Sequence, residues 1–188
     1  MKRFIDNIQK TFGVSQQEVE LLNNKLKVIH LSKNDFFLQE GEISNRIGFV
    51  ESGALRQFYG ASDKEFCNDF YFENSFVCSF ASMLSNRPSE INIAAIEECE
   101  ILVFSYVDVI QLFEQSRALK EFAIFILQEH LIKGERREAE LLRVTPEDRF
   151  KGLMEMHPKI FKRVPLHFIA SYLNITPETL SRYRAKLG

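Results

Sequence analysis

The pattern of hydrophobic and polar residues changes twice along the chain and divides it into three parts. Between Lys27 and Tyr106, short runs of β-branched and aromatic residues alternate with turn residues such as Gly41 and Gly53. Strands at a spacing of about 8–12 residues, with turns between them, are typical of an all-β roll of the jelly-roll kind. The stretch "GFVESGALR" predicts two of these strands with a glycine-centred turn between them.

Helical periodicity stands on both sides of the predicted roll. Ser15 and Glu18 form a capping-box pattern ahead of an apolar stripe and predict a helix over 15–27. A shorter helix is expected before it, ending near Gly13. Residues 107–142 contain almost no turn residues and repeat apolar side chains at helical spacing, which predicts one long helix of about 30 residues.

The predicted long helix is apolar around nearly its whole circumference at 122–127. A helix that packs on only one side of a domain needs a single apolar stripe, so the second face favours contact with another copy of the chain. The alternative is a helix buried in the core of its own domain. The residues predicted for a homodimer interface are Leu112, Leu119, Phe122, Ile126 and His130.

Two Thr-Pro phrases predict helix starts near the C-terminal end of the chain. In "VTPED" Thr145 is the expected N-cap, and in "ITPET" Thr176 has the same role. A proline at the first helical position needs no amide partner, and an acidic residue after it complements the positive helix end. One helix is therefore expected from Pro146 and another from Pro177.

The segment before the second phrase, "LHFIASYL", predicts a helix that buries Ile169 and Leu173. Asn174 follows it, and asparagine tolerates the left-handed conformation that a tight turn requires. Together with Leu180 and Tyr183 on the next helix, these residues have the spacing of a helix-turn-helix, whose second helix enters a DNA major groove. Other packed helical hairpins bury residues at similar spacing, so the motif needs support from its context.

The outward face of this second helix supplies the predicted DNA contacts. Arg182 suits guanine O6 and N7, and Glu178 suits the amino group of cytosine. Cationic side chains nearer the helix end suit phosphates. The full predicted set is Thr176, Pro177, Glu178, Thr179, Ser181, Arg182, Arg184 and Lys186.

The charge distribution supplies part of that context. The net charge is −2, but residues 143–188 hold nine Lys and Arg against four Asp and Glu, whereas residues 1–142 hold fifteen against twenty-two. An acidic body with a basic C-terminal part is compatible with nucleic-acid binding. The predicted organisation is α+β, with a β-roll domain at 1–106, a dimerisation helix at 107–142 and a helix-turn-helix domain at 143–188.

This order of elements resembles the family of the cyclic-AMP receptor protein and the fumarate–nitrate regulator (Crp/Fnr), over about residues 20–188. The resemblance rests on the segments "EGEISNRIGFVESGALR", "ALKEFAIFILQEHL" and "IASYLNITPETLSRYR". The resemblance implies a dimeric transcription regulator that reads a palindromic operator, with RNA polymerase as a further candidate partner. Glu178 and Arg182 fall at base-reading positions of the family motif, but Pro177 stands where an arginine is common.

The resemblance implies an effector pocket at Val77, Cys78, Ser79, Phe80, Arg87 and Ser89. In nucleotide-binding members, a Gly-Glu pair and a later Arg-Ser or Arg-Thr pair hold the ribose and the cyclic phosphate. Here these places are taken by Cys78–Ser79 and by Ser89–Glu90, and Arg87 lies two residues too early. An acid at a phosphate site is repulsive, so cyclic AMP is not expected. The effector is unknown, and sensing is either of another ligand or lost.

Other functional classes have little support in the sequence. Three widely spaced cysteines and four scattered histidines predict neither a disulfide framework, an iron–sulfur cluster nor a metal site. No H-x-H pair or nucleophile-elbow motif occurs, so no enzymatic activity is expected. The remaining alternative is a small-ligand sensor or protein-interaction module of the same fold that does not bind DNA.

The expected location is the cytoplasm, because no apolar run is long enough to span a bilayer and the N-terminus lacks the apolar region of a signal peptide. The chain stops at Gly188, just after the predicted recognition helix, so the β-wing found in many family members is not expected. A branch that lacks the wing and a truncated chain both remain open.

Overall fold

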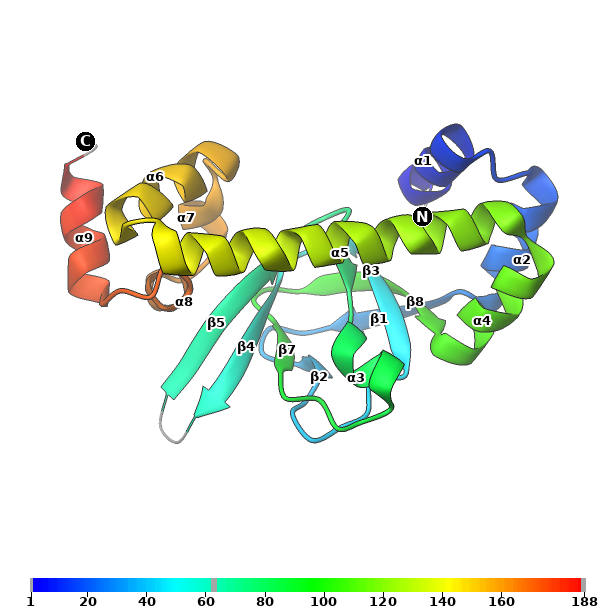
Figure 1. The fold of residues 1–188 in the computed structure, drawn as a ribbon, viewed down its shortest axis with the longest axis horizontal. Coiled ribbons are helices and arrows are strands. Elements are labelled where there is room, and N and C mark those ends of the chain that lie inside the picture. Colours follow the sequence, from blue (N-terminus) through cyan, green and yellow to red (C-terminus); the bar gives the residue numbers. More distant parts are fainter. Residues whose placement is uncertain (1, 62–63, 187–188) are drawn as a thin grey trace.

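Two four-stranded antiparallel sheets form a roll in the middle of the molecule, and one long helix lies across it (Figure 1). The computed structural model describes residues 2–61 and 64–186. The strand orders are β1-β8-β3-β6 and β2-β7-β4-β5. Their bounds are β1 (Lys27–Leu31), β2 (Phe36–Leu38), β3 (Arg46–Ser52), β4 (Leu55–Ala61), β5 (Lys64–Tyr71), β6 (Phe76–Val77), β7 (Asn92–Ala95) and β8 (Cys99–Ser105).

The roll is closed around an apolar core that both sheets supply. Val50 of β3, which pairs with Ile101 of β8, is buried there beside Leu55 of β4 and Ile93 of β7. The turn between β3 and β4 is centred on Gly53, as predicted, with a φ of +93°. A Cβ atom at Gly53 would lie 2.4 Å from the carbonyl oxygen of Glu98, so only glycine fits this turn.

Helices lie at both ends of the roll and along one side of it (Figure 1). The predicted capping box at Ser15 is confirmed: its amide donates to Glu18 Oε2 at 2.7 Å, and its hydroxyl accepts from the Glu18 amide at 3.3 Å. The helices are α1 (Lys2–Phe12), α2 (Gln16–Lys25), α3 (Phe80–Ser85), α4 (Tyr106–Gln115), α5 (Arg117–Arg143), α6 (Pro146–Met156), α7 (Ile160–Arg163), α8 (Leu166–Tyr172) and α9 (Pro177–Ala185).

The prediction of a single helix over 107–142 is wrong, because the helix is interrupted at Ser116. This residue is extended, with φ −143° and ψ 118°, and it ends α4 and caps α5. Its hydroxyl accepts from the Leu119 amide at 3.0 Å and donates to the Glu18 carboxylate of α2. This contact between distant parts of the chain holds Ser116 outside the helix. The 27 residues of α5 still span about 40 Å.

The first half of α5 packs against α1 and the β1-β8-β3-β6 sheet. The Phe122 ring lies 5.1 Å from Phe12, 5.6 Å from Phe76 and 6.1 Å from Phe4, measured between ring centroids. Contacts between phenylalanine rings therefore hold α1 against α5 and the sheet. Among the helices of the described residues, none combines the length and hydrophobicity that a bilayer-spanning segment needs.

Helices α6–α9 share their hydrophobic core with the roll. Phe150, Leu153 and Ile169 from these helices pack in one buried cluster with Cys67 and Phe70 of β5. The C-terminal helices are thus attached to the β2-β7-β4-β5 sheet by apolar contact. Leu187 and Gly188, the last residues of the predicted DNA-binding domain, lie outside the described residues.

Candidate nucleic-acid interface and effector pocket

Helices α8 and α9 are joined by a tight turn at Asn174. This residue has φ +53°, so its predicted left-handed conformation is confirmed. The Asn174 amide donates to the carbonyl of Ser171 at 3.0 Å, and the Ile175 amide donates to the carbonyl of Ala170 at 3.0 Å. This pair of hydrogen bonds is a Schellman motif, which ends α8 and turns the chain directly into α9.

Helix α9 begins as its sequence predicts. Pro177 occupies the first position, and the Thr176 hydroxyl accepts from the Thr179 amide at 3.3 Å. Leu180 is fully buried, and the Tyr183 ring lies 5.7 Å from the Phe150 ring of α6. These inward contacts fix which face of α9 remains at the surface.

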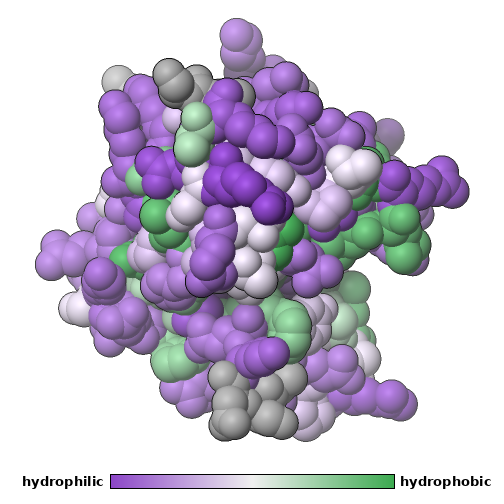
Figure 2. Space-filling view, turned by 90° about the vertical axis from the view of Figure 1, so that its left-hand side faces the viewer, coloured by the Kyte–Doolittle hydropathy of each residue, from purple (hydrophilic) through white to green (hydrophobic). Residues whose placement is uncertain are grey.

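The surface face of α9 carries Glu178, Ser181 and Arg182, all exposed. A hydrogen bond with Thr176 is the main cause that lowers the pKa of Glu178, so this side chain is an anionic acceptor near neutral pH. The Arg182 guanidinium lies 5.9 Å from the Tyr183 ring and extends into solvent. Figure 2, which views the end of the molecule where α9 lies, shows a predominantly hydrophilic surface.

Two other predicted DNA contacts are engaged within the protein. The Arg184 guanidinium lies 4.9 Å from the Phe161 ring, and Lys186 Nζ lies 3.4 Å from Glu147 Oε2 at the start of α6. The Thr179 hydroxyl is 3.3 Å from that of Thr176. All eight predicted residues therefore lie on or beside α9, but Lys186 has an acidic partner already.

Four of the five residues predicted for a dimer interface pack within their own chain, whereas the fifth, His130, is exposed. Leu112 and Leu119 are buried in the core that α1 and α2 share with the roll, and Phe122 packs there too. Ile126 packs on the cluster around α3. His130 lies against the Phe80 ring with a centroid distance of 4.7 Å.

A different stripe of α5 is apolar and exposed. It contains Ile124, Leu127, Leu131 and Leu141, and Leu131 is 63% exposed. With Gly134 and Glu138, these positions follow the alternating three- and four-residue spacing of a coiled-coil seam. The sequence contains this signal, but Phe122 and Ile126 on the inward face obscure it.

Five of the six residues predicted for the effector pocket are buried in the chain. They are Val77, Cys78, Ser79, Phe80 and Ser89. The last of these donates its hydroxyl to the carbonyl of Ile91 at 2.9 Å. Burial raises the pKa of the Cys78 thiol, which makes it a small neutral group and not a reactive thiolate.

A second serine closes the loop that follows α3. The Ser82 hydroxyl accepts from the Ser44 amide at 3.0 Å and donates to the carbonyl of Arg87 at 2.6 Å. The Arg87 side chain is exposed. The serines of this loop therefore form hydrogen bonds within the chain, and Arg87 lies at the surface. They do not arrange hydrogen-bond donors around a site for an anion.

A cavity of about 1330 Å³ lies between β5, α3, the middle of α5 and the helices α6 and α7. Cys78, Ser79, Phe80 and Arg87 line it together with His130, which α5 supplies. Its charged groups include Lys133 and Asp69, whose Nζ and Oδ2 atoms are 2.6 Å apart. No cluster of three or more His, Cys, Asp or Glu suited to a metal ion occurs among the residues that the structure describes.

Comparisons with known proteins agree with this architecture. Residues 28–116 match the family model of the cyclic nucleotide-binding domain. Curated protein sequences give no match. FixK2 from Bradyrhizobium japonicum is similar in structure, with a TM-score of 0.75 and 18% identity over 86% of this chain and 84% of that one.

Two further solved structures have the same arrangement. The c-di-GMP-responsive regulator CLP of Xanthomonas campestris has a TM-score of 0.69 and 18% identity, covering 92% of this chain and 91% of its own. A Crp/Fnr-family transcriptional regulator from Eubacterium rectale has a TM-score of 0.69 and 13% identity, covering 91% and 82%. The chain therefore has the Crp/Fnr fold, which confirms the resemblance and the predicted α+β class.

Proposed function

We propose that this chain is a DNA-binding transcription regulator that reads a palindromic operator as a homodimer. The observation that carries the proposal is the orientation of α9. Leu180 and Tyr183 hold the helix to its neighbours, while Glu178, Ser181 and Arg182 are exposed on its free face. A recognition helix needs this division between a packed face and a polar face that is free to enter the major groove.

The exposed side chains suit base edges and phosphates in different ways. Arg182 has the guanidinium geometry that pairs with guanine O6 and N7, and Glu178 can accept from cytosine N4. Arg184 and Lys186 suit phosphates, which position the protein without reading sequence. Lys186 would exchange its contact with Glu147 for a phosphate. Pro177 offers no donor, so the operator is expected to differ from those of family members with arginine there.

The exposed stripe of α5 supports a homodimer formed by two copies of this helix. Ile124, Leu127 and Leu131 would meet their counterparts across a two-fold axis. This seam is proposed in place of Leu112, Leu119, Phe122 and Ile126, which pack within the chain. Two α9 helices in such a dimer would read half-sites about one helical turn, or roughly 34 Å, apart.

The roll is proposed to act without cyclic AMP. Ser79, Ser82 and Ser89 bond within the chain at the place of the phosphate cassette, and the Arg87 side chain is exposed. The effector stays unidentified, and the cavity beside Phe80 and His130 has room for one. On this proposal, residues 1–106 are the sensor, 107–142 the dimerisation segment and 143–188 the DNA-binding domain.

The proposed partners are double-stranded DNA and a second copy of the chain, with RNA polymerase as a candidate at the promoter. We propose that the protein has no catalytic activity. We also propose that it is located in the cytoplasm.

Selection of bound sequences from a random DNA pool tests the proposal, with and without a small-molecule cell extract. Recovery of an inverted repeat supports it, and a change in enrichment with the extract reveals a ligand. Absence of binding to any sequence at low salt would instead favour a ligand sensor or protein-interaction module.

A further inference from the structure

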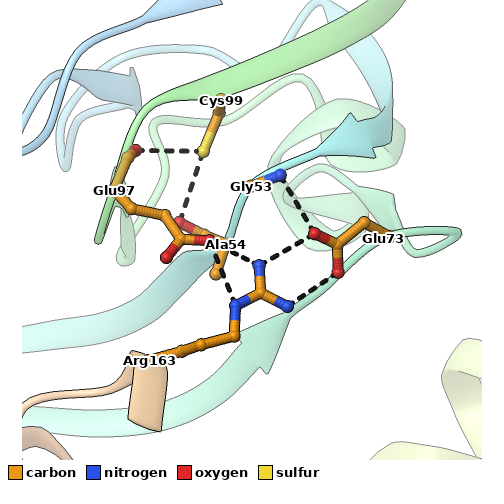
Figure 3. A network of polar contacts seen from close by, with 6 residues as sticks. All are labelled: Gly53, Ala54, Glu73, Glu97, Cys99 and Arg163. Atoms are coloured by element: carbon orange, nitrogen blue, oxygen red, sulfur yellow. Dashed lines mark hydrogen bonds and ion pairs between the residues drawn. The ribbon is translucent and has the colours of Figure 1, made fainter.

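The C-terminal helices also contact the roll through an ion-pair network (Figure 3). Arg163, the last residue of α7, donates from its two terminal nitrogens to the two carboxylate oxygens of Glu73, each at 2.8 Å. Its Nε donates to Glu97 Oε1 at 3.2 Å, and a terminal nitrogen also donates to this oxygen. One guanidinium is thus bound by two carboxylates in a fixed plane.

Both carboxylates come from turns of the roll. Glu73 lies between β5 and β6, and Glu97 between β7 and β8. Glu73 Oε1 also accepts from the amide of Gly53, at 3.2 Å, in the turn between β3 and β4. The network therefore joins α7 to three turns that are distant in sequence. A planar arginine fork fixes direction as well as distance, which a lysine would not do.

Arg163 and Glu73 are both charged near neutral pH. Hydrogen bonds from Arg163 are the main cause that lowers the pKa of Glu73, and those to Glu73 and then Glu97 raise the pKa of Arg163. The three side chains are only partly exposed, at 29% for Arg163 and 36% for each glutamate. Their contact is therefore screened less than an exposed surface pair.

A second polar contact fixes α8 on the free edge of the β2-β7-β4-β5 sheet, which β5 forms. The Ser171 hydroxyl accepts from the Cys67 amide at 2.9 Å and donates to the carbonyl of Glu65 at 2.8 Å. The Ser171 hydroxyl therefore pairs backbone groups of β5 that a neighbouring strand would pair in the interior of a sheet. Arg137 of α5 donates to the carbonyl of Tyr172, the last residue of α8.

We propose that Arg163, Glu73 and Glu97 form a latch that fixes the orientation of α6–α9 on the roll without a bound ligand. The shared apolar core supplies attachment but little direction, because dispersion and burial are non-directional. The latch and the Ser171 contact supply the direction. The position of α9 is then set by the turns of the roll, whatever α9 binds.

Hydrogen exchange measured by mass spectrometry tests the latch on the full chain and without DNA. In Arg163→Met, we expect the amides of 166–186 to exchange about tenfold faster or more, because a charged hydrogen-bond partner is lost. Protection of β1, β3 and β8 should stay as in the wild type. The matched control is Arg136→Met, which changes an exposed arginine of α5 and should leave both regions unchanged.

Unchanged exchange in 166–186, or equal acceleration in the roll strands, would overturn the latch. A second set of variants guards against a purely local effect at Arg163. In the combination Glu73→Gln with Glu97→Gln, we expect the same selective acceleration, and little more when Arg163→Met is added. Additive effects of the two changes would contradict a single latch. These outcomes do not depend on whether the protein binds DNA.

Discussion

His130 of α5 lies against Phe80, the first residue of α3, with their ring centroids 4.7 Å apart. The first was predicted for the dimer interface and the second for the effector pocket, and the structure brings them together inside one chain. The middle of the long helix therefore closes one side of the cavity next to α3. A ligand in this cavity would contact the same helix whose exposed stripe is proposed to form the dimer.

The environment of His130 predicts a pH-dependent stability. Partial burial is the main cause that lowers the pKa of this surface side chain below the ordinary 6.5, with Asp69 opposing the shift and Lys133 adding to it. As pH falls through 6.5, His130 becomes protonated in the unfolded chain before it does so in the folded chain. The free energy of unfolding therefore decreases between pH 6.5 and the lower pKa of the folded state. Thermal unfolding should show a smaller loss between about pH 7 and pH 5.5 in His130→Phe than in the wild type.

Part of the pH dependence should remain in that variant, because burial also lowers the pKa of His157. If His130→Phe lost as much stability as the wild type over this range, the burial argument would be wrong.

The proposed dimer seam predicts that Leu131→Glu gives a monomer. Two copies of α5 would place this side chain against its own counterpart, where an unpaired carboxylate is costly to bury. Sedimentation equilibrium should show a dimer for the wild type and a monomer for the variant. Val107→Glu introduces the same charge at an exposed position of α4 and should leave the dimer intact. A monomeric wild type, or a dimeric Leu131→Glu, would contradict the seam.

Local rules of helix and turn formation predicted much of the fold. Gly53 and Asn174 have the positive φ angles that their sequence context suggested, and Thr176 caps the helix that it was expected to cap. Each of these depends on neighbours within a few residues. The order of strands and helices also identified the correct fold class.

Contacts between distant residues explain what could not be predicted. The break at Ser116 depends on Glu18, 98 residues earlier, and the latch joins Arg163 to Glu73 across 90 residues. One sequence contains no signal that links such pairs. The sequence pattern did not separate the inward face of α5 from its exposed stripe, because Phe122 and Ile126 are as apolar as that stripe.

The contact between Lys186 and Glu147 predicts that an acidic residue limits phosphate binding. In Glu147→Gln, Lys186 is free to contact DNA, so we expect tighter binding to random duplex DNA and a salt dependence steeper by about one unit of log–log slope. Asp148→Asn removes a similar charge from the same turn without touching Lys186. Equal effects of the two substitutions would show only a general loss of negative charge.

The most direct test of the account is the affinity of Arg182→Ala for the selected operator and for random DNA, measured by fluorescence anisotropy at fixed salt. We expect a loss of about 1–3 kcal/mol on the operator and almost none on random sequence, since Arg182 is proposed to read a base. Arg117→Ala, at the opposite end of α5, serves as the matched control and should bind both as the wild type does. An equal loss on both DNAs, or no loss on either, would contradict the assignment of α9 as the recognition helix.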